Sequence, residues 1–161
     1  MPETFSDSFG KQISLRAVVA EILAFMAAEP NRRYTVTIGT DSELLADKTA
    51  DFVTAIVVHR VGNGGRYFWQ RYALGKFYTL RDRIIREVLI SIDMAKAMVL
   101  ELEQVHGKLP EFAFEIHADV GMNGPTKQMI QEVVGMIRAN NFAVRTKPDS
   151  YAATNVADRH V

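Results

Sequence analysis

The chain has 161 residues with 19 basic and 19 acidic side chains, and 48% of its residues are hydrophobic. This length favours a single domain over residues 1–161, large enough for one hydrophobic core. The absence of cysteine excludes disulfide bonds and cysteine-ligated zinc, and the balanced charge counts against binding nucleic acid by bulk electrostatics.

Two further features bear on the location of the protein in the cell. The first 29 residues lack the basic start and the uninterrupted apolar segment of a signal peptide, and no stretch is apolar for long enough to cross a bilayer. The lack of cysteine fits a reducing compartment. We therefore expect a cytoplasmic protein without membrane association, and the sequence leaves the number of subunits open.

Hydrophobic periodicity and turn residues predict four helices and five strands. The helices are expected at about residues 13–29, 79–106, 123–140 and 151–161. The strands are expected at 33–41, 51–60, 66–74, 112–119 and 141–146. Pro125 is expected near the first position of the third helix. A polar loop at 42–50 joins the first two strands, and a glycine-rich hairpin connection at 61–65 joins the second and third.

The order of these elements predicts an α/β domain with a mixed five-stranded sheet and helices on both faces. Strands joined by hairpins run antiparallel, whereas strands joined through a helix run parallel. The first strand is therefore expected at the centre of the sheet, beside the fourth. In such a sheet, the ligand site lies outside the carboxyl ends of the central strands.

Four acidic residues lie where this topology gathers side chains. Asp41 ends the first strand and Asp119 ends the fourth, while Glu87 flanks the apolar face of the long helix and Asp158 lies in the last helix. Each acid alone has an ordinary role as a turn, cap or surface residue. Gathered together they would repel one another, and Mg²⁺ or Mn²⁺ would relieve that repulsion. Two such ions can activate water and stabilise the leaving oxygen in phosphodiester cleavage.

Several neighbouring side chains are candidates for supporting roles. Glu43 shares a strand face with Asp41, and His117 shares one with Asp119, so either is a candidate extra ligand or proton carrier. A hydrogen-bonded interior histidine is the plainer interpretation of His117. The candidate phosphate contacts are Arg81, Arg86 and Lys127.

Four segments closely resemble a bacterial protein family, and together they span about Tyr34 to Asp158. They are IGTDS, FVTAIVVHRVGNGGRYF, EIHADVGMNGPTKQMIQEVVGMI and TKPDSYAATNVAD. The family is the YkuK-like group of predicted ribonuclease H-like proteins. The resemblance implies a ribonuclease H-like fold with strand order 3-2-1-4-5, numbered along the chain, and with strand 2 antiparallel.

Ribonuclease H-like proteins place acids in the first strand, the first long helix, the end of the fourth strand and the last helix. The resemblance therefore implies a Mg²⁺- or Mn²⁺-dependent nuclease that acts on RNA, DNA or a hybrid of the two. Asp149 is an alternative fourth acid, and Asn155 lies one helical turn before Asp158. The four acids implied by the resemblance are Asp41, Glu87, Asp119 and Asp158.

Other interpretations remain open at this point. A non-catalytic module that binds nucleic acid or a protein partner fits the neutral charge. An actin-like ATPase would need a phosphate loop, and GMNGPTK at 121–127 lacks the spacing G-x-x-x-x-G-K-[ST]. Asp41-Ser42-Glu43 resembles the start of a proofreading exonuclease, but Thr154 stands where those enzymes carry His or Tyr.

Overall fold

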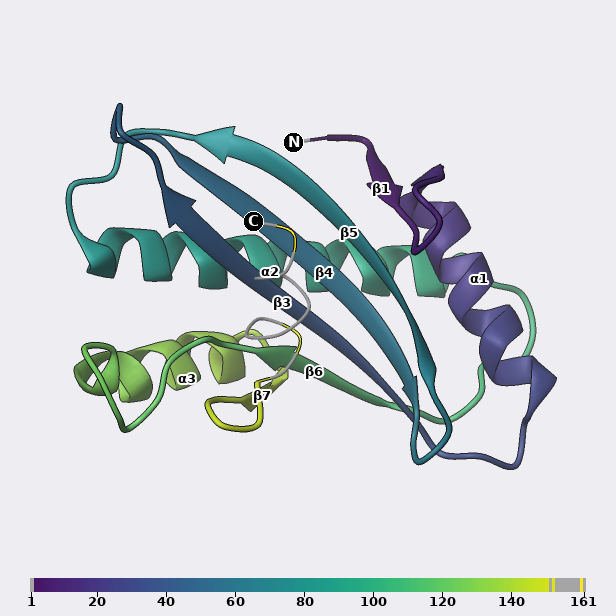
Figure 1. Ribbon diagram of the computed structural model, residues 1–161. Coiled ribbons are helices and arrows are strands. Elements are labelled where there is room, and N and C mark those ends of the chain that lie inside the picture. The colour runs from purple at the N-terminus through teal and green to yellow at the C-terminus, as the bar shows by residue number, and fades with distance from the viewer. Residues whose placement is uncertain (1, 151, 153–159, 161) are drawn as a thin grey trace.

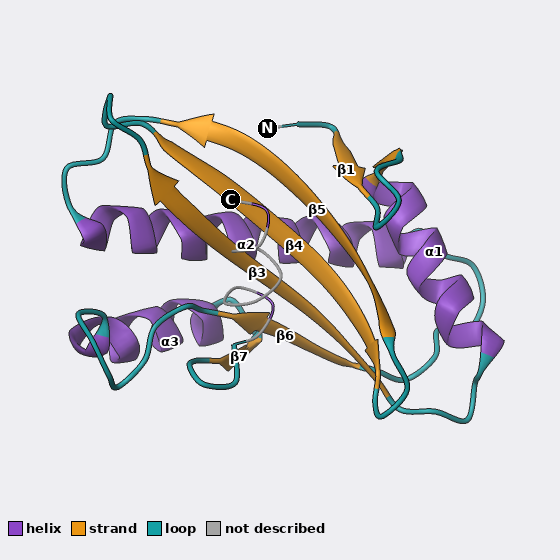
Figure 2. Ribbon diagram, in the orientation of Figure 1, coloured by secondary structure: helices purple, strands orange, loops and turns teal. Residues whose placement is uncertain are grey.

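The computed structural model describes residues 2–150, 152 and 160. In that part of the chain, seven strands form one sheet, which three α-helices accompany (Figures 1 and 2). The strands are β1 (Thr4–Ser6), β2 (Gln12–Ser14), β3 (Tyr34–Leu44), β4 (Ala50–Arg60), β5 (Gly65–Leu74), β6 (Ala113–His117) and β7 (Ala143–Arg145). The helices are α1 (Leu15–Ala28), α2 (Leu80–Glu103) and α3 (Ile130–Ala139), with a 3₁₀ turn η1 (Lys127–Met129) before α3.

The sheet is mixed, with the order β2-β1-β5-β4-β3-β6-β7. Strands β3, β4 and β5 form an antiparallel meander, while β6 lies parallel to β3 and β7 parallel to β6. The prediction of a five-stranded sheet was wrong in number, since β1 and β2 extend it beyond β5. The five expected strands are β3 to β7, which occupy successive places as β5-β4-β3-β6-β7.

The additional hairpin of β1 and β2 is built from residues that read as polar and irregular in the sequence. The carboxylate of Asp7 accepts hydrogen bonds from the backbone N–H groups of Phe9 and Lys11, both at 2.9 Å, which closes the turn. Phe5 and Ile13 lie opposite each other in the hairpin, and both are buried in the core. One acid thus closes the turn, and two apolar side chains anchor the hairpin in the core.

The central strand β3 is longer than expected. It continues through Ser42 to Leu44, where a loop was predicted, because β4 pairs with it along its whole length. The partners of these last residues include Ala50 and Phe52, which are fully buried and hold the strand end in place. This extension brings Ser42 into regular strand geometry directly beside Asp41.

Helices α1, α2 and α3 all pack on one face of the sheet, so of the four expected helices only the one predicted at 151–161 could cover the other face. Alternate strand residues such as Val36 and Ile38 form one large core cluster with apolar residues of α1, α2 and α3. On the opposite face, Val53 and Ala55 belong to a smaller cluster that includes Ala152. Most of the helix expected at 151–161 lies outside the described residues.

The helix boundaries follow recognisable caps. Ser14 accepts from the N–H of Ala17 at the start of α1, and Thr79 accepts from the N–H of Asp82 at the start of α2. Helix α3 begins at Ile130, so Pro125 precedes the helix rather than opening it as expected. None of the helices described has the combination of length and apolar character that spanning a membrane requires.

Candidate functional site

The register of the parallel strands brings three charged residues to one edge of the sheet. Gly39 of β3 lies opposite His117 of β6, and His117 lies opposite Arg145 of β7. The next side chain on the same face comes two residues later in each segment. Those three residues are Asp41, Asp119 and Lys147.

Helix α2 presents a row of polar side chains to the end of β3. Glu87 is buried, with 4% of its surface exposed, and its Oε2 accepts a hydrogen bond of 2.7 Å from the Ser42 hydroxyl. One turn earlier, Arg83 donates to the carbonyl and the hydroxyl oxygens of Ser42 at 3.0 and 3.1 Å. One turn later, the hydroxyls of Ser91 and Thr40 lie 2.7 Å apart. These helix residues recur every four positions, so they share one face.

The electrostatic surroundings of Glu87 link it to the two strand-end acids. Burial raises the pKa of the Glu87 carboxyl well above its usual value, and the charges of Asp41 and Asp119 raise it further. The hydrogen bond from Ser42 and the charge of Arg83 act in the opposite direction. Asp41 and Asp119 therefore both lie within electrostatic reach of Glu87, which is not a solvated helix residue.

Lys147 is a member of this site that the sequence analysis did not single out. Its Nζ lies 3.1 Å from Oδ1 of Asp119, and its backbone N–H donates to the carbonyl oxygen of Val120 at 2.8 Å. The side-chain stem passes over Gly121, where an added Cβ would lie 2.8 Å from the Cβ of Lys147. The signal in the sequence was positional, because Lys147 follows β7 by the same interval at which Asp119 follows β6.

The carboxylates do not form a ready-made metal centre. Among the described residues, no three His, Asp or Glu side chains are grouped so as to hold a metal ion. Glu87 and Asp119 are turned toward protein donors, and alternation along β3 puts Asp41 on the face opposite to Ser42. As a donor set, carboxylate oxygens suit Mg²⁺ or Mn²⁺. Holding such an ion would require small side-chain movements away from the protein donors.

A very small cavity lies inside this arrangement. It measures about 10 Å³, close to the space of one water molecule, and its lining includes Glu87, Ser91, His117 and Asp119. The buried end of the site is therefore nearly filled. A ligand larger than one water molecule does not fit in this cavity.

His117 has the environment of a structural histidine. Its Nδ1 accepts a hydrogen bond of 3.1 Å from the N–H of Ala152, which places the proton of the neutral ring on Nε2. Nε2 lies 3.7 Å from a carboxylate oxygen of Glu115. Burial lowers the pKa of His117, although the charge of Glu115 raises it in part. These contacts are those of a hydrogen-bonded interior histidine, which was the plainer of the two interpretations of His117.

The remaining acidic and amide candidates lie apart from this cluster or outside the described chain. Glu43 is exposed on β3, opposite Asp51 of β4. Asp149 is exposed, and its charge acts on the pKa of His117 rather than on that of Glu87. The remaining two candidates, which lie outside the described residues, are Asn155 and Asp158.

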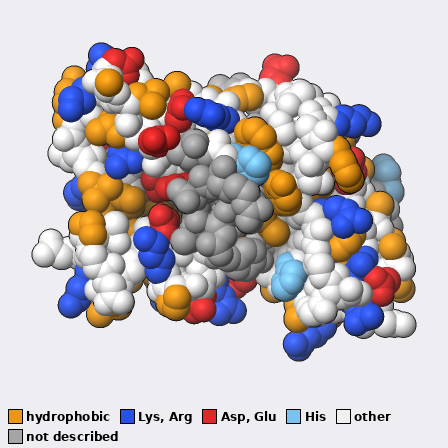
Figure 3. Space-filling model, in the orientation of Figure 1, with side chains coloured by type: hydrophobic (Ala, Val, Ile, Leu, Met, Phe, Trp, Pro, Cys, Tyr) orange, Lys and Arg blue, Asp and Glu red, His pale blue; other side chains and the backbone are white. Residues whose placement is uncertain are grey.

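The three residues predicted to contact phosphate are all exposed, and they differ in the protein groups that they contact. Arg81 forms an ion pair with Glu132 of α3, and the guanidinium of Arg86 lies 5.9 Å from the ring centre of Phe77. Lys127 is exposed in η1. In the preceding loop, the N–H of Gly121 is bonded to the hydroxyl of Thr126, so this amide is not directed at an anion as in an ATPase phosphate loop. Acidic and basic side chains interleave on the face shown in Figure 3.

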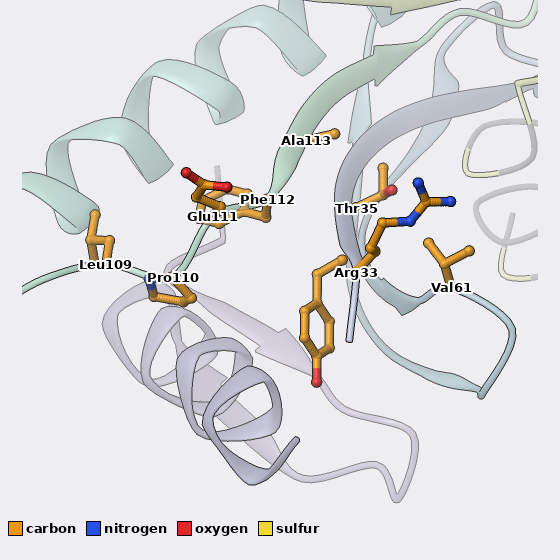
Figure 4. A pocket seen from close by; sticks show the side chains of 9 residues that line it. Arg33, Thr35, Val61, Leu109, Pro110, Glu111, Phe112 and Ala113 are labelled. Atoms are coloured by element: carbon orange, nitrogen blue, oxygen red, sulfur yellow. The ribbon is translucent and has the colours of Figure 1, made fainter. Parts of the chain in front are cut away.

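A much larger hollow lies at the other end of the central strands. It has a volume of about 710 Å³ and is lined by side chains that include Arg33, Thr35, Glu111 and Phe112 (Figure 4). Thr35 lies near the start of β3, whereas Asp41 lies toward its end. This hollow is therefore separate from the acidic site.

Comparison with known proteins places the chain in a family. A family model described as Ribonuclease H-like matches residues 17–161. A protein of Bacillus subtilis (strain 168) named "Uncharacterized protein YkuK" is 32% identical over 158 residues, which cover 92% of this chain and 91% of that protein. No solved structure matches the chain. The chain thus belongs to the ribonuclease H-like family, within its YkuK-like group.

Proposed function

We propose that the protein is a metal-dependent nuclease that cleaves phosphodiester bonds of nucleic acid at the edge formed by β3 and β6. The observation that carries this proposal is the burial of Glu87 beside two further acids, Asp41 and Asp119. A buried carboxyl among like charges is costly for stability alone. A bound cation would offset this cost by neutralising the acids. The family has a nuclease-like fold, which agrees with such a site.

Each acid would have a distinct role. Asp41 and Asp119, which are half-buried, would supply the anionic oxygens that first meet a cation. Glu87 would keep its proton to a higher pH than an ordinary carboxyl, because its pKa is raised, and Ser42 would hold its carboxyl in one orientation. Asp158 is proposed as the fourth acid. Mg²⁺ or Mn²⁺ bound there would supply an activated water and charge stabilisation at the leaving oxygen.

The substrate proposed is RNA, DNA or a hybrid of the two. The candidate phosphate contacts are all exposed, and Arg81 would exchange its ion pair with Glu132 for a phosphate group. Because the net charge of the chain is zero, we expect modest affinity that depends on a few local contacts rather than on a broad basic surface.

A cleavage screen tests the proposal. Single- and double-stranded RNA and DNA, a hybrid and a junction are incubated with Mg²⁺, Mn²⁺ or EDTA. The proteins compared are wild type, Asp41→Asn and Asp93→Asn, the last being an exposed acid of α2 that serves as the charge-matched control. We expect cleavage that stops in EDTA, persists in Asp93→Asn and falls at least about 100-fold in Asp41→Asn. Equal cleavage by Asp41→Asn and wild type would refute the assignment.

One observation favours a second candidate function, a non-catalytic module that binds nucleic acid or a protein partner. Lys147 already neutralises Asp119, and the described acids do not stand ready to hold a metal. Such a module would bind its partner equally well in EDTA and would tolerate Asp119→Asn. Metal-independent binding without cleavage in the same screen would favour this candidate.

A further inference from the structure

The contact between Lys147 and Asp119 sits at the place where the proposed cation would bind. The ammonium Nζ lies 3.1 Å from Oδ1 of the carboxylate, which is 19% exposed at its side chain. The Lys147 side chain is 42% exposed. A pair this open to solvent contributes little to stability, so its effect on charge at the site matters more than its strength.

The main chain around Lys147 fixes where its side chain starts. The N–H of Lys147 donates to the carbonyl oxygen of Val120, and the N–H of Asp149 donates to that of Thr146, both at 2.8 Å. Gly121 leaves room for the lysine stem, which an alanine at that position would crowd. The ammonium group is therefore directed at Asp119 by the backbone and by packing.

Two positive side chains face the acids, and they differ in how firmly they are held. Arg83 makes two hydrogen bonds to Ser42, which is itself bonded to Glu87. Lys147 reaches Asp119 through the end of a flexible, half-exposed side chain. An arriving divalent cation would displace the lysine more easily than the arginine.

We propose that Lys147 is the resident counter-ion of the acidic site and that it weakens the binding of divalent cations there. A cation that takes Asp119 as a ligand must first displace the Lys147 ammonium. The displaced ammonium stays close to the site and repels the bound cation. This inference rests on the proposed function. It identifies a positioning residue that regulates access of the cation to Asp119.

Direct binding of Mn²⁺ measures this effect without any need for turnover. Free Mn²⁺ is titrated by its EPR signal against wild type and the variants Lys147→Met and Lys147→Gln. Methionine keeps an unbranched stem over Gly121, and glutamine is a second neutral replacement in case the first folds poorly. Lys147→Arg retains the charge, and Lys108→Met removes an exposed lysine from the loop before β6.

We expect Mn²⁺ to bind about tenfold more tightly to the two neutral variants, the size of effect that one nearby charge has on a carboxylate. The Lys108→Met control should match wild type, and the arginine variant should bind Mn²⁺ no more tightly than wild type does. If wild type binds Mn²⁺ and the neutral variants bind it equally or more weakly, the role of Lys147 is wrong while the metal site stands. If neither wild type nor the neutral variants bind Mn²⁺, both the role of Lys147 and the proposed metal site are refuted.

Discussion

The burial of Glu87 predicts an unusual dependence of stability on pH. Its pKa is raised above the ordinary 4.5 in the folded protein, first by burial and then by the charges of Asp41 and Asp119. As the pH rises above about 4.5, the unfolded chain loses this proton while the folded chain keeps it. The stability that the proton confers is fully present below 4.5 and is lost as the pH rises toward the raised pKa.

The variant Glu87→Gln removes this effect with little change in shape. Glutamine has almost the same size, and its side-chain oxygen can still accept the hydrogen bond from Ser42. The folded and unfolded states of wild type differ by at most one bound proton at this residue. The folding equilibrium constant of the variant relative to wild type should therefore rise by up to about tenfold per pH unit above 4.5. The rise should stop once the pH passes the raised pKa.

Urea denaturation from about pH 5 to about pH 8, in EDTA, measures this ratio. Asp93→Asn is the control, because it replaces an exposed acid on the same helix and should leave the pH profile unchanged. The reasoning is refuted if wild type and Glu87→Gln lose stability in parallel across the whole range. That result would mean that the Glu87 carboxyl titrates normally.

Four further variants test individual contacts by urea denaturation. His117 has a lowered pKa, so its own contribution to stability falls as the pH drops below 6.5, and the folding equilibrium constant of His117→Gln relative to wild type should rise by up to about tenfold per pH unit in that direction; a ratio that does not change with pH would contradict this. Ser42→Ala should cost about 1–3 kcal/mol, because it leaves the buried Glu87 without its donor, and a cost near zero would exclude that bond. Gly121→Ala should cost about 1–3 kcal/mol through crowding of the lysine stem. Gly135→Ala, in open space on α3, should instead stabilise by about 0.5–1 kcal/mol, and equal effects of the two alanines would be inconsistent with these contacts.

The central part of the fold could be predicted because its sequence signals agree with one another. Strands β4 and β5 are β-branched and aromatic and are joined by glycines, and α2 carries a long helical repeat of apolar residues. The placement of Asp41 and Asp119 at the same end of the neighbouring strands β3 and β6 followed from one rule, that parallel neighbours end at the same edge of a sheet. The burial of Glu87 did not follow, because a residue beside an apolar stripe is buried or exposed according to what the helix packs against.

The features that sequence analysis missed depend on tertiary pairing. Strands β1 and β2 have three residues each and gain their stability from the sheet they join, so their own sequence carries little signal. Ser42 reaches Glu87 because β3 is extended by its partner β4. Lys147 reaches Asp119 through the register of β7, a strand of three residues, and no rule of local sequence fixes such a register.

The most direct test of the account is the location of a bound cation. Crystals of the protein grown with Mn²⁺ would be measured for anomalous scattering, which marks the ion without reference to activity. The account predicts a peak in contact with carboxylate oxygens of Asp41 and Asp119, with Lys147 moved away from Asp119. The account is contradicted if Mn²⁺ binds at full occupancy somewhere else. It is also contradicted if Lys147 and Asp119 still form their ion pair at saturating Mn²⁺.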